Sequence, residues 1–414
     1  MDVEILTIGT ELLLGHVIDE NAAFLGRALG SLGVRVTRRT TVADQAGAIE
    51  AAVGEGLART RFVVTSGGLG PTSDDVTKRA VAGIYGAELE FVPAIWETLV
   101  ARFARQGRQP PERNRCQAEV PRGAEVLPNP RGTAPGLWLS GPCGEVVMLP
   151  GVPAEFRGLV GEALLPRLRD RGMGRGGVIR SLTLRTTGLA ESAVADRLAD
   201  LEPELAPLTL AFLPGLDGVD LRLTSWEGAE PLATRDLARA GERLAERLAG
   251  HVYGRDEDDL AGMLVREFRA RGWRLAVAES CTGGMLGQRI TAIPGSSAVF
   301  LGGVIAYADR LKEELGVPAR ILAARGAVSE ETAGQMALAV RDRYRADIGL
   351  AITGIAGPDG GLPEKPVGLV WSALASGAGV EAFRTIFPGS RQEIRARACQ
   401  QALWKAWSLA RTAP

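Results

Sequence analysis

Thr65-Ser66-Gly67-Gly68-Leu69-Gly70-Pro71-Thr72-Ser73-Asp74-Asp75 is the stretch of sequence that decides how the first part of the chain folds. It follows the apolar run 61–64, which predicts a buried strand, and it precedes residues 76–82, which predict a helix. A glycine-rich turn at this place lets backbone N–H groups approach a phosphate, and the helix N-terminus favours an anion. The two aspartates suggest a divalent cation with oxygen ligands. A tight turn that ends in helix-capping residues is the simpler alternative.

The composition is that of an ordinary globular protein without a strong overall charge. The 414 residues suggest about three domains, and 48 basic against 49 acidic residues give a net charge of −1. Such a charge offers no general attraction for nucleic acid or an anionic membrane. No stretch approaches the roughly 18 apolar residues of a membrane helix, and the first residues lack the basic segment of a secretion signal. We therefore expect a cytoplasmic protein with no membrane or nucleic-acid partner.

The residue inventory argues against several kinds of site. None of the four cysteines has Cys-x-x-Cys spacing, so neither a zinc knuckle nor a disulfide framework is indicated. The two histidines, His16 and His251, cannot build a multi-histidine metal centre, and neither lies in a recognisable Ser-His-Asp motif. Any catalysis should therefore rely on other side chains.

The order of expected strands and helices predicts three domains. Residues 1–170 alternate strand and helix patterns, which indicates an α/β domain with a doubly wound parallel sheet. A linker rich in glycine and arginine at 171–177 leads to a small α+β domain at 178–252, with a β-α-β-β-α order and no obvious chemistry. The alternation returns at 256–414 and predicts a second α/β domain. Its acidic start, 256–259, is expected to open a helix, with a metal site as the minor alternative.

Three further loops of the first domain are candidates for the same site as the glycine-rich turn. They are Gly9-Thr10-Glu11-Leu12-Leu13-Leu14-Gly15, Asn129-Pro130-Arg131-Gly132-Thr133-Ala134-Pro135-Gly136 and Leu149-Pro150-Gly151-Val152-Pro153-Ala154-Glu155. Glu11 follows the first expected strand, and doubly wound sheets bind ligands at the carboxyl edge of their strands. Each loop alone is weak evidence, because glycine and proline mark turns everywhere. Together the four loops predict one site.

The last domain contains a second glycine-rich turn, Ala278-Glu279-Ser280-Cys281-Thr282-Gly283-Gly284, which also predicts an anion site between a strand and a helix. Its candidate nucleophiles are Ser280, Cys281, Ser296 and Ser297. Because residues 256–414 contain no histidine, a serine needs another base, and Lys312 helped by Tyr307 can serve. The simpler alternatives are a helix cap for the serine pair, a surface lysine and a small buried cysteine.

The motifs of the first domain, T-S-G-G-L-G-P-T-x-D-D, G-T-E-L-L-x-G, G-T-A-x-G and L-P-G-V-P-x-E, resemble the N-terminal domain of the CinA family (competence/damage-inducible protein). That domain is similar to the molybdopterin-binding fold of MogA and MoaB. The resemblance implies a pyrophosphatase that hydrolyses ADP-ribose to AMP and ribose 5-phosphate with a divalent metal, cobalt or magnesium. Carried over, Gly67, Gly68, Gly70 and Thr72 hold phosphate, and Asp74, Asp75 and Glu11 hold or orient the metal.

The motifs of the last domain resemble the CinA C-terminal domain, a deamidase of nicotinamide mononucleotide (NMN) also called PncC. They are A-E-S-C-T-G-G, P-G-S-S, G-G-V-x-x-Y, a lysine five residues after that tyrosine, and T-G-I-A-G-P-x-G-G. The resemblance implies hydrolysis of the carboxamide of NMN to nicotinic acid mononucleotide and ammonia, with no cofactor. Where many relatives carry Ser-Asn-Glu after the tyrosine, this chain has Ala308-Asp309-Arg310, which leaves the lysine in place.

The same resemblance assigns roles to residues of the last domain. Ser297 is the nucleophile or orients the carboxamide, Lys312 is the base and Tyr307 is its partner, although spacing alone does not rank Ser297 over Ser280. The nucleotide is bound by Ser280, Thr282, Gly283 and Gly284, by Thr353 and Gly354 across the cleft, and by Arg395 at the phosphate.

The combined expectation is a bifunctional enzyme of pyridine-nucleotide salvage whose partners are NMN, ADP-ribose and a second copy in a homodimer. The resemblance covers nearly the whole chain. Two alternatives stay open. The first domain can be a molybdopterin- or nucleotide-binding module without pyrophosphatase activity, or the protein can be a non-enzymatic accessory of DNA uptake or repair. The near-neutral charge argues against the latter.

Overall fold

The computed structural model describes residues 2–105, 107–172, 179–226 and 230–413. Most of the predicted linker, residues 173–177, lies outside these ranges. The chain divides into two compact units, residues 1–180 with 225–235 and residues 181–224 with 236–414. The second unit contains both the small middle domain and the C-terminal domain, and each unit is treated by itself.

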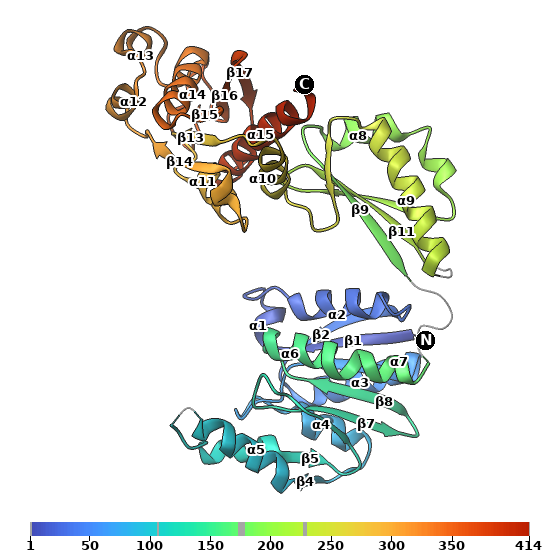
Figure 1. The fold of residues 1–414 in the computed structure, drawn as a ribbon. Helices are drawn as coiled ribbons and strands as arrows, with labels where there is room; N and C mark the ends of the chain where they lie inside the picture. The colour runs from blue at the N-terminus through green and yellow to red at the C-terminus, as the bar shows by residue number, and fades with distance from the viewer. Residues whose placement is uncertain (1, 106, 173–178, 227–229, 414) are drawn as a thin grey trace. The chain divides into compact units, whose positions relative to one another are not determined.

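The first unit is a three-layer α/β domain built on a six-stranded sheet with the order β2-β1-β3-β8-β7-β6 (Figure 1). The strands β2, β1, β3 and β8 are parallel, and β7 and β6 are antiparallel additions. A separate antiparallel pair joins β4 to β5. In chain order the elements are β1 (Asp2–Ile8), α1 (Thr10–Leu13), α2 (Glu20–Gly30), β2 (Arg35–Val42), α3 (Ala46–Thr60), β3 (Phe62–Ser66), α4 (Thr77–Ile84), β4 (Leu89–Phe91), α5 (Pro93–Ala104), η1 (Glu112–Ala118), β5 (Glu119–Pro121), β6 (Glu125–Leu127), β7 (Gly136–Gly141), β8 (Gly144–Leu149), α6 (Pro153–Leu159), the π-helical turn η2 (Val160–Leu164) and α7 (Leu165–Asp170).

Helices cover both faces of this sheet, as the alternating sequence pattern predicts. On one face, α2 and the α6–α7 segment bury Leu25 and Phe156 against Ile5 and Val64. On the other face, α3 and α4 pack against side chains of the same strands that point to the opposite side of the sheet. Because successive strand residues face opposite sides, a strand that is apolar throughout supplies both cores.

The middle domain is a four-stranded antiparallel sheet with the order β10-β11-β9-β12. Its β-α-β-β-α order agrees with the prediction, and β12 is an additional strand that the sequence pattern did not reveal. The elements are β9 (Arg180–Thr186), α8 (Glu191–Leu198), η3 (Glu202–Leu205), β10 (Thr209–Pro214), β11 (Val219–Ser225), α9 (Glu230–Arg247) and β12 (Val252–Arg255). The strand β11 alternates buried and more exposed residues, so only one face of the sheet contributes to the domain core.

The C-terminal domain is built on a five-stranded sheet with the order β14-β13-β15-β16-β17. The strands β14, β13 and β15 are parallel, and β16 and β17 continue antiparallel. The elements are α10 (Leu260–Arg271), β13 (Leu275–Glu279), α11 (Met285–Thr291), η4 (Ser296–Ala298), β14 (Phe300–Ile305), α12 (Asp309–Leu315), α13 (Ala319–Arg325), α14 (Glu330–Tyr344), β15 (Ile348–Gly354), β16 (Leu369–Ser376), β17 (Gly379–Ile386) and α15 (Arg391–Thr412). As expected for the acidic run before α10, Asp259 caps this helix by accepting from two of its backbone N–H groups.

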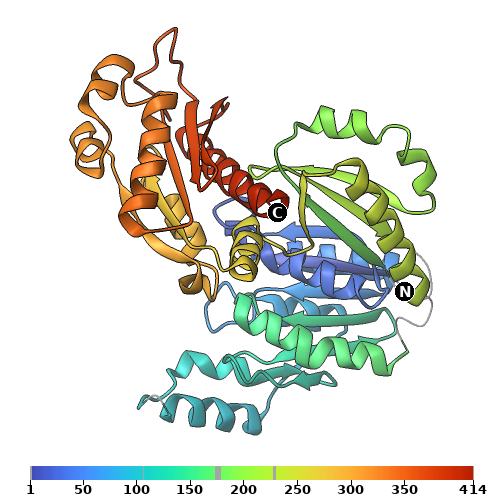
Figure 2. The same cartoon turned by 45° about the horizontal axis from the view of Figure 1, so that its top comes forward.

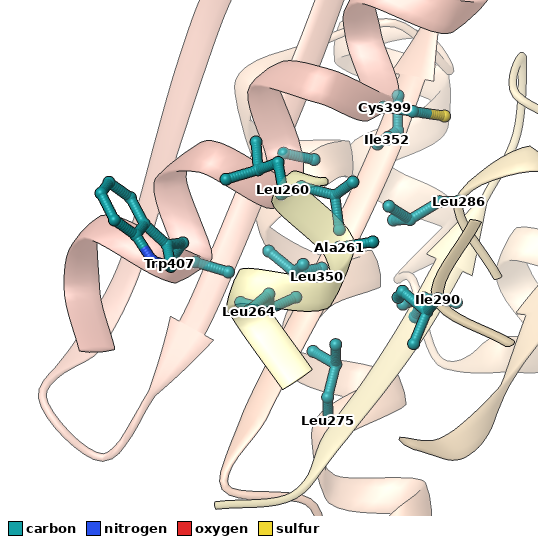
Figure 3. Packing of buried hydrophobic residues seen from close by; sticks show 14 of the residues in the cluster. Leu260, Ala261, Leu264, Leu275, Leu286, Ile290, Leu350, Ile352, Cys399 and Trp407 are labelled. Carbon is teal, nitrogen blue, oxygen red and sulfur yellow. The ribbon is translucent and has the colours of Figure 1, made fainter. Parts of the chain in front are cut away.

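Apolar packing holds α10 and α15 against the same face of the sheet (Figure 3). Leu260 and Leu264 of α10 lie beside Trp407 of α15 and above Leu350 of β15, all fully or almost fully buried. The two helices run side by side in both ribbon views (Figures 1 and 2). This packing fixes the start of α15, which contributes to the site described below. No helix among the described residues is long and apolar enough to cross a membrane.

The middle and C-terminal domains contact each other through α15. The indole Nε1 of Trp404 donates to the Gly250 carbonyl at 3.0 Å, and its ring centroid lies 5.3 Å from that of His251. One turn earlier, the buried Gln400 amide donates to the Thr187 hydroxyl at 3.4 Å. Buried polar groups need such partners, so this contact belongs to the folded structure of the second unit.

Candidate functional sites

Three parallel strands of the C-terminal domain end at one edge of the sheet and bring several predicted site residues together. Ser280 follows β13, and its N–H donates to the Ile352 carbonyl of β15 at 2.9 Å. On the other side of β13, the Ala306 N–H donates to the Glu279 carbonyl at 2.8 Å, which fixes the chain just before Tyr307. The carboxyl edge of a parallel sheet is the usual place for a ligand site.

A cavity of about 200 Å³ opens at this edge. Five of the predicted residues line it, and its wall is completed by residues from the α13–α14 connection and from the start of α15. The lining residues are Ser280, Cys281, Tyr307, Asp309, Lys312, Ala327, Val328, Thr353, Gly354, Ala356 and Arg391. The structure therefore brings together Ser280, Tyr307, Lys312, Thr353 and Gly354, which are far apart in the sequence.

Lys312 is a buried lysine of the cavity wall, with a relative exposure of 1%. Its ammonium donates to the Tyr307 carbonyl at 2.9 Å and to the Asp309 carboxylate at 3.4 Å. A lysine ammonium has three N–H donors, and charged side chains are rarely buried without a specific role. The simpler sequence interpretation, a surface lysine, is therefore wrong.

Arg391 is a cavity residue that the sequence reasoning missed. It is the first residue of α15, directly after the N-cap Ser390, and its guanidinium donates to the Tyr307 hydroxyl at 3.1 Å and to the Gly357 carbonyl at 2.8 Å. Tyr307 is half exposed, so this pair lies at the mouth of the cavity. The capping box that begins α15 could have pointed to Arg391, because it places this arginine at a helix start beside the edge of the sheet.

The helix start that follows the glycine-rich turn after β13 does not offer a free anion site. Glu279 is almost fully buried, and its carboxylate accepts from the N–H groups of Gly284, Leu286 and Gly287 at 2.8–3.0 Å. An internal carboxylate therefore already occupies the start of α11, where a phosphate was expected. The prediction of an anion site between this strand and the start of the helix is corrected on this point.

Arg395, Thr282 and Gly283 form a support behind the turn and do not line the cavity. The Arg395 guanidinium donates to the Thr282 carbonyl at 2.7 Å and lies next to Gly283. The Thr282 hydroxyl and the Arg395 Nε are buried and have no hydrogen-bond partner among the described residues. Arg395 thus braces the turn, whereas Arg391 is the arginine that reaches the cavity.

Ser297 lies at the opposite edge of the sheet from Lys312. It is an exposed residue of η4, just before Phe300 at the amino end of β14, while Lys312 follows the carboxyl end of that strand. Six strand residues span roughly 20 Å. Within one chain, the pairing of Ser297 with Lys312 that the resemblance implied does not fit this geometry, and Ser280 is the serine at the cavity.

Cys281 also lines the cavity but is a poor nucleophile. Burial raises the pKa of its thiol to about 11, so the thiol is protonated at neutral pH. This agrees with the interpretation of Cys281 as a small buried residue.

The predicted phosphate turn of the first unit follows β3 and packs closely against its neighbours. The Gly67 N–H donates to the Leu149 carbonyl at 3.0 Å, and its φ of +112° is one that side-chain-bearing residues rarely adopt. A Cβ atom at this position would lie only 2.3 Å from the Ile8 carbonyl oxygen. No described residue accepts a hydrogen bond from the N–H groups of Gly68 or Gly70, so these donors are available to a ligand.

The loops expected to surround this turn do converge at the carboxyl edge of the sheet. The Asn21 side-chain amide donates to the Ser66 hydroxyl at 3.1 Å and to the Gly151 carbonyl at 2.8 Å. The Asn129 amide donates to the Glu155 carboxylate at 2.6 Å, which joins the third and fourth loops. Asn21, near the start of α2, therefore links two of the loops.

Lys78 is a second buried lysine, in the first turn of α4 after the glycine-rich turn. Its ammonium donates to the carbonyls of Cys116 and Glu119, and burial lowers its pKa. The Cys116 thiol in turn points to the Gly70 carbonyl at 3.8 Å. Lys78 therefore ties η1 and β5 to the base of the turn and places a positive charge near it.

The three predicted metal ligands do not form one ready-made metal centre. Among the described ranges, no group of three or more His, Cys, Asp or Glu side chains is close enough to hold a metal ion. The Asp75 carboxylate accepts from the N–H and hydroxyl groups of Thr72 and so braces the turn, and Glu11 is exposed beside Gly9. Asp74 and Asp75 still fit a cation such as Mg²⁺, which usually takes one or two carboxylates together with substrate phosphates.

Comparison with known proteins gives the family of the chain. Three family models match successive segments: the "Probable molybdopterin binding domain" at residues 4–170, the "Damage-inducible protein CinA KH domain" at 181–254 and the "CinA C-terminal domain" at 257–408. A CinA-like protein of Gemmatimonas aurantiaca is 54% identical over 406 residues, which cover 97% of this chain and 95% of the relative. The chain belongs to the CinA family.

A second relative agrees with this assignment, and a similar solved structure is given beside it. A putative competence-damage inducible protein of Moorella thermoacetica is 42% identical over 412 residues, which cover 98% of each chain. Among solved structures, the competence/damage inducible protein CihA of Agrobacterium tumefaciens is 42% identical, with a TM-score of 0.34, over 35% of this chain and 89% of that chain. The resemblance described from the motifs is therefore confirmed.

The match of residues 181–254 to a KH domain was not expected from the sequence. KH domains bind a nucleic-acid backbone with a Gly-x-x-Gly loop. This segment contains one such sequence, Gly215-Leu216-Asp217-Gly218, at the β10–β11 turn. There the Asp217 carboxylate lies 3.5 Å from the Arg289 guanidinium of α11. An acidic residue paired within the protein is ill suited to contact a phosphate backbone.

Proposed function

We propose that the C-terminal domain hydrolyses the carboxamide of nicotinamide mononucleotide, giving nicotinic acid mononucleotide and ammonia. The observation that carries this proposal is the buried side-chain nitrogen of Lys312 in the cavity that Ser280 also lines. The cavity volume of about 200 Å³ is below the roughly 300–1,000 Å³ of pockets that enclose a whole ligand. It therefore suits the nicotinamide ring, with the ribose phosphate at the mouth beside Arg391.

In the proposed reaction Lys312 acts in its neutral amine form. The Ser280 hydroxyl adds to the carboxamide carbon, while the Lys312 amine takes the hydroxyl proton and passes it to the departing nitrogen. The carbon–nitrogen bond breaks, ammonia leaves, and an ester to Ser280 remains. Water then hydrolyses this ester to the carboxylate and restores the serine. Arg391 and Tyr307 bind and orient the nucleotide, and a guanidinium is the side chain best suited to a phosphate.

Ammonia release from NMN by the purified protein, measured with a chelator present, tests this proposal. We expect activity in the wild type, and a loss of roughly a hundredfold or more in Ser280→Ala and Lys312→Met. Ser297→Ala should keep most of the activity, because Ser297 lies at the far edge of the sheet. An inactive wild type would overturn the deamidase proposal. A Ser297→Ala enzyme without activity and an active Ser280→Ala enzyme would overturn the choice of serine.

We also propose that the first domain hydrolyses ADP-ribose to AMP and ribose 5-phosphate. The supporting observation is the pair of free N–H groups at Gly68 and Gly70, with the Asp75 carboxylate beside Gly70, at the edge where the loops converge. The turn would bind the diphosphate through these N–H groups, with the Lys78 charge nearby. A divalent cation bound at Asp74 and Asp75 would neutralise charge on the diphosphate and polarise water.

AMP release from ADP-ribose, with magnesium or cobalt present, tests the second proposal. We expect Asp74→Asn to lose activity and to need a higher metal concentration, while the deamidase activity is unchanged. ADP-ribose binding without hydrolysis in the wild type would instead favour a nucleotide-binding module. The name of the matching family, "Probable molybdopterin binding domain", is compatible with that alternative. Salt-sensitive DNA binding in the micromolar range would favour an accessory of DNA uptake or repair.

A further inference from the structure

A groove on the first unit is not used by either proposed reaction as described so far. It has a volume of about 780 Å³ and lies between α5 and the chain segment from Val126 to Pro135. One wall consists of a face of α5 with Ile95, Thr98 and Leu99, and the other contains Val126, Pro128 and Pro135. The volume falls within the roughly 300–1,000 Å³ typical of small-molecule sites.

The chemistry of the walls suits a planar aromatic ring. Aliphatic side chains and proline rings form most of the lining, and Thr98 and Thr133 add hydroxyl groups. Arg102 and Arg105 line the groove at the C-terminal end of α5, so they give it a positive rim. An apolar slot with a basic rim is complementary to an aromatic ring that is attached to phosphate groups.

The wall opposite α5 is a loop that several side-chain hydrogen bonds hold in place. The Asn129 amide donates to the Ala134 carbonyl, and its oxygen accepts from the N–H groups of Arg131 and Gly132 at 3.0–3.1 Å. The Arg102 guanidinium donates to the carbonyls of residues 130 and 131. A preformed wall reduces the entropy that a ligand must overcome on binding.

The groove is connected with the glycine-rich turn through two short links. Gly132 lines the groove and lies against the Glu155 carboxylate, and the loop that precedes Glu155 touches the turn, where Gly151 packs on Gly67. On the other side, the Gln117 amide donates to the Thr133 hydroxyl at 3.1 Å, next to the residue whose thiol points to Gly70.

We propose that this groove holds the adenine ring of ADP-ribose while the diphosphate lies on the glycine-rich turn. The inference rests on the proposed pyrophosphatase function and adds the subsite that recognises the base. Thr133 accepts one hydrogen bond from Gln117, so its own proton is free to be donated to a ring nitrogen. The apolar walls exclude water around the adenine ring. Ribose 5-phosphate, the other half of the substrate, has no such ring.

Binding of AMP and of ribose 5-phosphate, measured by calorimetry, tests the subsite without requiring hydrolysis. Thr98→Trp fills the groove from an exposed helix position whose hydroxyl bonds only to its own helix. The matched control is Glu97→Trp, an exposed neighbour on the same helix that does not line the groove. We expect Thr98→Trp to weaken AMP binding by roughly tenfold or more, to leave ribose 5-phosphate binding unchanged, and the control to bind both like the wild type.

Each result decides for or against the subsite. Unchanged AMP affinity in Thr98→Trp, or equal affinity of the wild type for AMP and ribose 5-phosphate, would overturn it. Dissociation of a dimer by Thr98→Trp in sedimentation would also overturn it, by showing that a second copy fills the groove. A wild type that shows the expected binding pattern but does not hydrolyse ADP-ribose would refute the pyrophosphatase proposal and leave the base-binding site standing.

Discussion

The two glycine-rich turns of this protein look alike in sequence but differ in what their backbone N–H groups bind. Each follows a strand at the carboxyl edge of a parallel sheet, and each predicted an anion site. After β13, the Glu279 carboxylate accepts from the N–H groups of Gly284, Leu286 and Gly287 at the start of α11, although those of Cys281 and Thr282 have no acceptor in the described structure. After β3 no carboxylate caps the N–H groups of Gly68 and Gly70. Glycines between a strand and a helix therefore do not suffice to predict a phosphate site, because a nearby acidic side chain can fill it.

The largest expected effect on stability comes from the substitution of Glu279. The variant Glu279→Ala removes the acceptor of three largely buried N–H groups, and each unsatisfied donor costs about 1–3 kcal/mol. We expect the C-terminal domain to lose about 3 kcal/mol or more of its free energy of unfolding, measured by urea titration. Glu313→Ala, at an exposed position, is the control and should change little. A loss below about 1 kcal/mol would mean that water replaces the carboxylate.

The stability of the turn after β3 should depend on Gly67 rather than on an acidic side chain. Gly67→Ala introduces a methyl group against the Ile8 carbonyl and a strained φ, for which we expect a loss of about 2 kcal/mol. The control is Gly54→Ala in the interior of α3, where a Cβ meets no neighbour and should be neutral or slightly stabilising. Thermal unfolding of the two variants compares them directly. If Gly67→Ala behaves like Gly54→Ala, the turn can relax and is not preformed.

Asp75 should have a smaller effect, because it is partly exposed. Asp75→Asn replaces the charged acceptor of the Thr72 N–H and hydroxyl groups, for which we expect a loss of about 1 kcal/mol. Magnesium titration of ADP-ribose hydrolysis would show a modest change in this variant and a larger one in Asp74→Asn. The reverse order would identify Asp75, and not Asp74, as the main metal ligand. Glu97→Gln serves as the exposed control for stability.

The smallest expected effect concerns pH and the Glu155 carboxylate that supports the neighbouring loop. Burial raises the pKa of Glu155 above its ordinary value of 4.5, against the opposing effect of the Asn129 hydrogen bond. The folded protein therefore binds this proton more tightly than the unfolded chain. The stability that it contributes is present below pH 4.5 and is lost as the pH rises through the higher folded-state pKa. Glu155→Gln should remove this part of the pH dependence of unfolding, and an unchanged profile would contradict the assignment.

Most of the fold was predictable because it follows from strong periodic patterns. The sequence pattern of residues 330–344 predicts a helix, which coincides with α14, and the apolar run 146–149 predicts a strand, which lies within β8. The strands β4 to β7 and the edge strands β12 and β17 were not predicted, because their stability comes from pairing with neighbours rather than from their own sequence. Residues 154–169 predict a single helix, but the structure inserts a π-helical turn at Val160–Leu164, which has no simple sequence pattern.

The candidate sites were predictable only in part. Spacing and motifs identified Ser280, Tyr307 and Lys312. They did not reveal that Ser297, the nucleophile implied by the resemblance, precedes β14 and so lies at the other edge of the sheet. Arg391 was overlooked in favour of Arg395, one helical turn away, because a choice between two arginines depends on the direction of the helix.

The contact that Trp404 and Gln400 make with the middle domain has a practical consequence for anyone who expresses part of this protein. A fragment that starts at the predicted boundary, residue 256, would remove the acceptors at Gly250 and Thr187 and expose the indole ring. Such a fragment is expected to be less soluble and less stable than one that starts near Ser181, the first residue of the second compact unit. The more useful cloning boundary therefore lies about a whole domain upstream of the one that family motifs suggest.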